Sequence, residues 1–189
     1  MGKTIKNKKT YSLNDYNSGD GMLTSVWGPG MWHSLHTISF NYPINPTKND
    51  KRNYRDYILN MKYILPCGKC RNNLRDNFKK LPLKMKHMEN RETFSRYVYE
   101  LHELINTMLG KKSGLSYNDV RERYEDFRAR CTISLKEVNS KRKTHKKREN
   151  GCTEPLYGEK SKCILKIIPN TIKEDTFQID EKCVKKVIE

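Results

Sequence analysis

Residues 27–40 read WGPGMWHSLHTISF, and this stretch decides the fold class. Several of its side chains fall at the i, i+3, i+4, i+7 and i+8 positions of one helix face, which is the pattern of an amphipathic helix. The residues on that face are Trp32, Leu35, His36, Ser39 and Phe40. Pro43 and Pro46 follow and end the helix, because a proline nitrogen has no hydrogen to donate. The stretch therefore predicts a helix with an indole and an imidazole on the same side.

A second helix is predicted shortly after the first. Residues 51–65 carry their apolar side chains on one side. Pro66 then stands where a new helix begins, since proline is tolerated in a first turn. That helix runs on through Phe78 and has Cys67 and Cys70 at its N-terminus.

Two later helices have recognisable start signals. Asn90 is a favoured N-cap residue, and the apolar-periodic stretch after it is ended by Gly110. Ser116 and Asp119 have the spacing of a capping box, with Asp in place of the usual Glu, and the apolar face of their helix runs to Cys131. Together these patterns predict a mainly α fold.

Composition divides the chain into four parts. Residues 1–24 are polar and lack an apolar period, so we expect a flexible tail, and residues 25–133 hold the helical domain. Residues 134–150 form a basic linker, in which KRKTHKKR at 141–148 has six basic residues out of eight. Residues 151–189 alternate turn residues with short apolar runs, which predicts a small cysteine-containing module with short strands.

Charge and hydropathy exclude two classes of protein. The chain has 38 Lys and Arg against 22 Asp and Glu, a net charge of +16. No run approaches the roughly 20 apolar residues of a membrane-spanning helix, and the polar start lacks the apolar core of a secretory signal. We therefore expect a cytosolic protein without a membrane partner. The charge leaves nucleic-acid binding as an alternative function, although no recognition-helix or zinc-finger pattern accompanies it.

The chain has six cysteines, at positions 67, 70, 131, 152, 163 and 183, and only the first two are closely spaced. In a chain without an export signal, such a CxxC pair indicates redox chemistry or half of a zinc site. At a helix N-terminus the dipole and the unpaired N–H groups stabilise a thiolate, which is the attacking species in disulfide exchange. A zinc site needs a second close pair of ligands, so we expect no metal, and a zinc-binding structural module stays a minor alternative.

A second pair of side chains repeats the arrangement of Trp32 and His36. His102 and Asn106 stand one helical turn apart on the helix that follows Asn90. Taken singly, Trp32 is well explained as a core residue and His36 as a buried histidine satisfied by the backbone. Two such pairs beside a CxxC favour a planar cofactor between them. No GxGxxG follows a predicted strand, so a Rossmann turn does not hold that cofactor.

Three motifs occur in a distinctive order along the chain. They are Trp27-Gly-Pro-x-x-Trp32-x-x-x-His36 ending in Tyr42-Pro43, then CxxC, then His102-x-x-Ile105-Asn106-x-x-Leu109-Gly110-Lys111. This combination resembles the Erv/ALR family of FAD-linked sulfhydryl oxidases over residues 26–131, and its Trp-Gly-Pro start is most similar to the branch encoded by large DNA viruses, including giant viruses. The resemblance implies a four-helix bundle with a short fifth helix, bound FAD, and electron transfer from client thiols to O2 with release of H2O2.

The resemblance also implies roles for single residues. Cys67 is implied as the interchange thiol and Cys70 as the charge-transfer thiol beside the flavin. The implied cofactor contacts are Gly28, Trp32, His36, Tyr42, Cys70, His102, Asn106, Lys111 and Tyr124. Tyr124 stands where many members have tryptophan, and Glu103 replaces the asparagine that usually follows the histidine. A homodimer, thiol-containing clients among virion proteins, and a place in the host cytoplasm, in the viral factory, or in the virion are implied as well.

The later cysteines leave three alternatives open. Cys152 and Cys163 flank a segment with proline and glycine, and we favour a structural disulfide that staples this small module. The resemblance also allows these two residues to form a shuttle disulfide on a flexible arm that reaches the clients. A different pairing with Cys183 or Cys131 is the third alternative, and Cys131 is expected to be buried on its apolar helix face.

Overall fold

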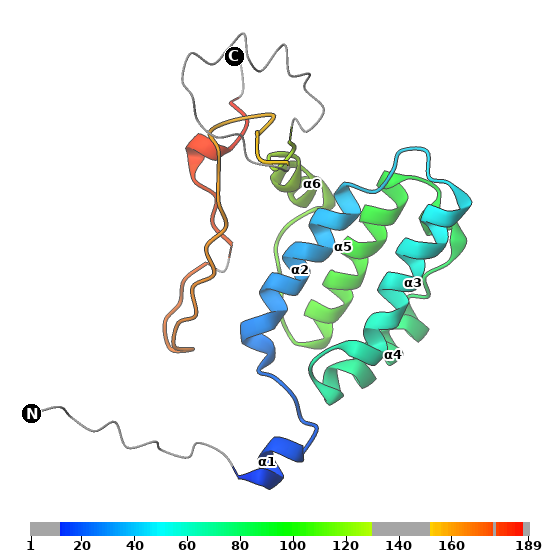
Figure 1. The fold of residues 1–189 in the computed structure, drawn as a ribbon, viewed down its shortest axis with the longest axis vertical. Coiled ribbons are helices and arrows are strands. Elements are labelled where there is room, and N and C mark those ends of the chain that lie inside the picture. Colours follow the sequence, from blue (N-terminus) through cyan, green and yellow to red (C-terminus); the bar gives the residue numbers. More distant parts are fainter. Residues whose placement is uncertain (1–11, 130–151, 176, 187–189) are drawn as a thin grey trace, which may run out of the picture.

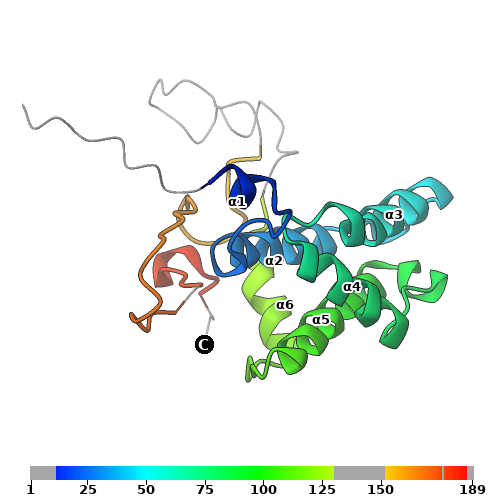
Figure 2. The same cartoon turned by 90° about the horizontal axis from the view of Figure 1, so that it is seen from below.

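The computed structural model describes residues 12–129, 152–175 and 177–186. Four helices lie side by side as a bundle (Figure 1), namely α2 (Thr24–Phe40), α3 (Lys48–Ile64), α4 (Gly68–Lys80) and α5 (Arg91–Met108). The shorter helix α6 (Tyr117–Glu125) packs on the flank formed by α2 and α5 (Figure 2). The predicted mainly α fold, a four-helix bundle with a short fifth helix, is confirmed.

Two helices, α5 and α6, begin at the caps that the sequence predicts. The Asn90 side chain accepts a hydrogen bond from the Thr93 N–H at 3.0 Å and thereby starts α5. The Ser116 hydroxyl accepts one from the Asp119 N–H at 3.2 Å and starts α6. Each cap satisfies a backbone donor that the first helical turn leaves unpaired. α6 ends at Glu125, so it stops short of Cys131, which lies outside the described residues.

The hydrophobic core fills the space between the four helices and the 3-10 helix η1 (Met85–Met88). Burying one such side chain is worth about 1.5–3 kcal/mol, so this core provides the main drive for assembly of the bundle. Its buried residues include Leu35, Ile58, Met61, Leu74, Met88, Phe94, Tyr97, Val98 and Leu101.

The segment before α2 contains a helix and a chain pairing that the sequence does not predict. Helix α1 (Leu13–Asn17) begins at an N-cap serine, and Gly21 forms an antiparallel bridge with Cys67. The Met22 N–H donates to the carbonyl of Pro66 at 2.6 Å. Gly21 has a φ of 90°, which glycine adopts without steric cost. This part of the expected tail therefore has defined contacts with the residues that precede α4.

The described part of the C-terminal segment contains a 3-10 helix, η2 (Glu181–Cys183), and no strand. An isolated bridge joins Pro155 to Ala129, and the Leu156 N–H donates to the Arg128 carbonyl at 2.6 Å. The prediction of short strands is wrong for these residues. Ile164, Leu165 and Ile167 are 75%, 68% and 65% exposed, so no partner surface covers the side that a strand would bury.

None of the described helices is both long and apolar enough to cross a membrane.

Candidate functional site

A disulfide between Cys67 and Cys70 stands at the N-terminus of α4. Cys67 is the N-cap residue, and its Sγ accepts a hydrogen bond from the Cys70 N–H at 3.2 Å. α4 therefore begins at Gly68, after the cap, and the expectation that Pro66 lies in its first turn is wrong. The helix dipole favours negative charge at Cys67 once the disulfide is reduced.

Cys70 lies between the α4 terminus and the start of α2. Its Sγ is 3.3 Å from the Thr24 hydroxyl oxygen, and in the disulfide only the hydroxyl has a hydrogen to donate. Cys70 also packs against the buried cluster that contains Leu74, and Trp27 and Trp32 pack against the same cluster. The sequence does not predict a role for Thr24, because only the tertiary structure brings the first residue of α2 to the CxxC.

Cys67 is covered by the chain that precedes α2. Only 9% of its surface is exposed, and Gly21 pairs with it directly. The Met22 carbonyl accepts a hydrogen bond from the Trp27 indole N–H at 3.0 Å, which joins this segment to α2. Residues 19–22 therefore restrict access to Cys67.

The predicted ring-bearing residues of α2 and α5 meet in the structure. Trp32 and His102 stack with ring centroids 3.8 Å apart and an angle of 6° between their planes. His36 Nε2 and His102 Nδ1 are 3.0 Å apart, within hydrogen-bond distance. The structure thus combines the two separate sequence motifs into one ring cluster, to which α6 contributes Tyr124, 5.3 Å from His36 between centroids.

Burial keeps the imidazoles of this cluster neutral. The pKa of His36 is lowered to about 3, first by burial and then by the nearby His102 and His33. The pKa of His102 is lowered to about 4, again mainly by burial, while Glu103 acts in the opposite direction and Lys111 in the same direction. Near neutral pH, one ring of the bonded pair donates its N–H and the other accepts.

Two nitrogen atoms beside the ring cluster lack a hydrogen-bond partner. The Nδ1 atoms of His33 and His36 are buried and unpaired. Buried polar atoms are nearly always satisfied in native proteins, so each such atom calls for a partner that the protein itself does not supply. His33 was not predicted as a site residue, although its position about one helical turn before His36 places both on the same side of α2.

The remaining predicted contacts lie around this cluster with different partners. The Asn106 amide donates to Glu103 Oε1 at 2.9 Å, so the glutamate that departs from the family pattern orients this side chain. The Lys111 N–H donates to the Asn106 carbonyl at 2.8 Å, just beyond the end of α5. Gly28 is buried on α2, where an added Cβ would meet only Thr24 Cγ2, at 3.6 Å. Packing within the described chain therefore does not by itself require glycine at position 28.

Tyr42, a predicted cofactor contact, lies in the hydrophobic core. Its side chain is completely buried, and its hydroxyl donates to the Met88 carbonyl at 3.0 Å. Its ring packs against Tyr54 and Phe94 with centroids 4.8 Å and 4.9 Å away. Tyr42 follows the end of α2 and turns toward α3 and η1, which makes it a core residue.

The favoured disulfide between Cys152 and Cys163 is also absent. Cys152 is disulfide-bonded, whereas Cys163 and Cys183 have free thiols. Cys163 is exposed in a part of the chain that packs against little else, so nothing brings it to Cys152. The expectation that Cys131 is buried falls outside the described residues.

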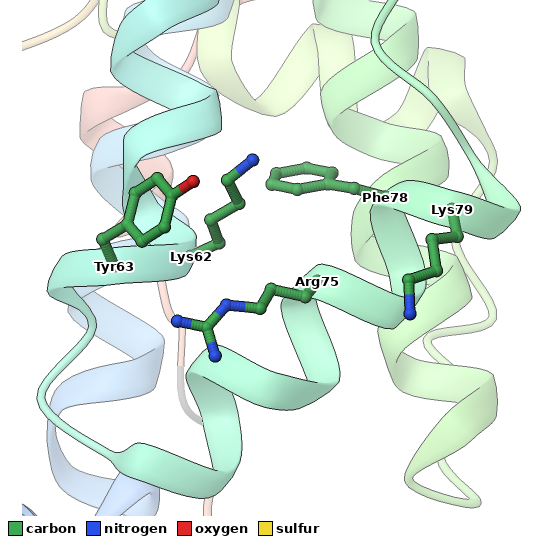
Figure 3. A pocket seen from close by; sticks show the side chains of 5 residues that line it. All are labelled: Lys62, Tyr63, Arg75, Phe78 and Lys79. Atoms are coloured by element: carbon green, nitrogen blue, oxygen red, sulfur yellow. The ribbon is translucent and has the colours of Figure 1, made fainter.

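A shallow pocket of about 330 Å³ lies between α3 and α4, apart from the predicted site residues. Figure 3 shows Lys62 and Tyr63 from α3 facing Arg75 and Phe78 from α4. The Lys62 Nζ and the Arg75 Cζ lie 5.0 Å and 5.7 Å from the centroid of the Tyr63 ring. The pocket holds no sulfur and no unpaired buried nitrogen, so the CxxC and the ring cluster remain the candidate site.

The residues of the candidate site fit a flavin nucleotide. FAD has two planar, nitrogen-bearing ring systems, and the cluster offers stacked aromatic faces together with the unpaired Nδ1 atoms of His33 and His36. A disulfide within the same packed cluster is the partner that flavin redox chemistry needs.

Several known proteins are similar to this chain in sequence. The model of the Erv1 / Alr family matches residues 29–125. A protein of Acanthamoeba polyphaga mimivirus named "Probable FAD-linked sulfhydryl oxidase" is 37% identical over 104 residues, which is 55% of this chain and 72% of the relative. An African swine fever virus protein named "FAD-linked sulfhydryl oxidase" is 30% identical over 99 residues, 52% of this chain and 80% of the relative.

Solved structures agree with these sequence matches. The FAD binding domain of Erv1 from Saccharomyces cerevisiae is 25% identical, with a TM-score of 0.50 over 56% of this chain and 96% of that domain. A cysteine-to-serine mutant of the same yeast protein has a TM-score of 0.50 at 22% identity, covers 66% of this chain and 98% of its own, and supports the fold alone.

Proposed function

Since this chain belongs to the Erv1/Alr family, we propose that it is an FAD-linked sulfhydryl oxidase that uses its Cys67–Cys70 disulfide to oxidise the thiols of client proteins. The observation that carries this proposal is the disulfide at a helix N-terminus, with Cys70 packed on the same cluster as Trp32. The oxidase unit is proposed to comprise residues 25–133, with the basic linker at 134–150 and the cysteine-containing segment at 151–189 outside it.

The thiol chemistry belongs to the two cysteines. A client thiolate attacks the Cys67 sulfur, a mixed disulfide forms, and Cys70 leaves as a thiolate. A second client thiol then displaces Cys67, so the client gains one disulfide and the CxxC gains two electrons and two protons. The α4 dipole and the Cys70 N–H stabilise the Cys67 thiolate, and the Thr24 hydroxyl can donate to that of Cys70. Stabilising the reduced dithiol raises the reduction potential of the CxxC, so its disulfide oxidises thiols more readily.

FAD, when bound, supplies the two-electron acceptor that returns the CxxC to its disulfide and passes the electrons to O2, which is released as H2O2. Trp32, His36, His102 and Tyr124 are the residues proposed to hold its rings. Further proposed FAD contacts, assigned from their positions in the family motifs, are Asn106, Lys111 and Gly28. Because His36 and His102 are neutral, they offer hydrogen bonds without adding charge to the site.

The wider setting of the enzyme is also a proposal. We propose that the clients are virion proteins with paired thiols, that the enzyme works as a homodimer in the host cytoplasm, and that disulfides form there despite the reducing environment. The viral relatives at 37% and 30% identity support this setting.

The absorbance spectrum and the oxygen consumption of the full-length protein test the proposal. We expect a yellow protein that consumes O2 with dithiothreitol. The Cys70→Ala variant should remain yellow and lose at least about a hundredfold in rate, because the dithiol that delivers the electrons is gone. Cys163→Ala, which removes an exposed free thiol, is the matched control and should keep the wild-type rate. A colourless protein, or an active Cys70→Ala variant, would contradict the proposal.

A further inference from the structure

The described C-terminal segment, which lies outside the residues that match the family, is attached to the end of α6 at two places. The Leu156 N–H donates to the Arg128 carbonyl at 2.6 Å. The Lys185 N–H donates to Asp126 Oδ1 at 2.9 Å. The chain between these attachments runs beside the bundle on the side of α2 and α6 (Figure 1). It is therefore held next to the helix that contributes Tyr124 to the ring cluster.

One side chain of this segment enters the ring cluster. The ring of Phe177 lies 5.3 Å from that of His33 and 5.9 Å from that of Tyr124, the latter nearly parallel at 15°. It meets Phe127 edge to face at 6.0 Å, and the Arg123 guanidinium carbon lies 5.4 Å from its centroid. The apolar side chains earlier in the segment stay largely exposed, so Phe177 is the exception.

The position of Phe177 connects it with the unsatisfied part of the candidate site. His33, which Phe177 contacts, has the buried and unpaired Nδ1 that calls for an outside partner. Tyr124, which is nearly parallel to Phe177, contacts His36, which has the second such atom. Phe177 thus contacts His33 directly and reaches His36 through Tyr124.

We propose that Phe177 is a further residue of the cofactor site, in which it completes the aromatic wall of His33, Tyr124 and Phe127 and slows the release of FAD. This inference rests on the proposed function, since it takes FAD as the ligand. Aromatic contacts add to affinity beyond the area that they bury, and truncation of a wall residue acts mainly on the dissociation rate. The C-terminal segment thereby becomes part of the flavin-binding unit.

The test measures how fast full-length protein releases FAD after dilution, followed by the rise of flavin fluorescence as the ring leaves its aromatic neighbours. Phe177→Ala should release FAD about tenfold faster than the wild type, and Phe177→Leu, which keeps apolar volume without a ring, should fall between them. Ile167→Ala removes an exposed side chain of the same segment and should match the wild type. Phe177→Leu decides the question if the alanine variant does not fold.

Each outcome is informative. If both Phe177 variants lower the unfolding midpoint but release FAD at the wild-type rate, Phe177 only packs the segment and the inference fails. If Ile167→Ala speeds release as much as Phe177→Ala, the effect belongs to the segment in general and the inference fails as well. A wild-type protein without flavin would overturn the proposed function itself, so the two failures are distinguishable.

Discussion

The burial of His36 determines its protonation state in the candidate site. Its side chain is 3% exposed, its Nε2 faces His102, and its Nδ1 has no partner. Protonation would place a positive charge on a buried ring that has neither water nor an anion beside it. Burial therefore disfavours the charged form and lowers the pKa of His36 to about 3. Because this environment keeps the imidazole of His36 neutral, the ring can contact a cofactor ring without adding charge to the site.

The depressed pKa of His36 predicts that the protein loses stability in mild acid. In the unfolded chain the residue takes up a proton near pH 6.5, whereas in the folded chain it does so only near pH 3. Stability is therefore lost as the pH falls from about 6.5 toward 3, and at pH 5 the loss from His36 alone is about 2 kcal/mol. Urea unfolding of flavin-free protein at pH 7.5 and pH 5 measures it. His36→Gln should lose about that much less, and an equal loss in both proteins would contradict the assignment.

At the scale of elements, the start of α4 depends on a segment that precedes α2. Residues 19–22 lie against Pro66 and Cys67, and Gly21 is the residue of closest approach. A Cβ on Gly21 would lie 2.2 Å from the Pro66 carbonyl oxygen, which no real structure tolerates. The contact therefore requires glycine at this position, and it limits access to Cys67.

Gly21→Ala should uncover Cys67. After reduction with dithiothreitol and its removal, we expect alkylation of Cys67, followed by mass spectrometry, to be at least about threefold faster than in the wild type. Gly19→Ala is the matched control, because Gly19 also has a positive φ, 73°, but an added Cβ there meets nothing within 4 Å. Equal alkylation rates in the two variants would show that backbone strain, and not the clash with Pro66, controls access.

At the scale of the whole molecule, Arg128 joins three parts of the chain. Its guanidinium donates to the Phe40 carbonyl at 2.5 Å and to Asn41 Oδ1 at 3.0 Å, both at the end of α2. It also pairs with Glu125 at 2.7 Å, and its own carbonyl accepts from Leu156. The positive charge lies at the negative end of the α2 dipole, where it is favoured. The short helix, the bundle and the C-terminal segment therefore share one anchor.

Arg128→Ala should destabilise the protein by about 1–3 kcal/mol, because several charge-assisted hydrogen bonds are lost and their acceptors remain. Urea unfolding at pH 7.5 measures the change. Lys79→Ala, which removes an ion pair whose partners are 78% and 64% exposed, is the control and should cost less than about 0.5 kcal/mol. A cost for Arg128→Ala as small as that of the control would mean that α6 is held by its apolar face alone.

The predictions from the sequence were accurate where the signal is local. Asn90 and Ser116 were placed as caps because a cap depends on residues three positions away. The place of Tyr42 in the core could not be predicted from its motif, because the neighbouring residues do not define where the chain turns after α2. The strands expected after residue 151 failed for a related reason, since short apolar runs predict a strand only if a partner strand lies beside them.

The amino-acid pattern alone determined that helices form, where α5 and α6 begin, and that two cysteines stand at the N-terminus of a helix. Tertiary structure alone decided that Trp32 stacks on His102, that Thr24 reaches Cys70, and that Phe177 arrives beside His33. The physical reason is the range of the forces involved. Caps and helical periodicity act over a few neighbouring residues, whereas contacts between distant side chains depend on how the buried faces of several helices pack together.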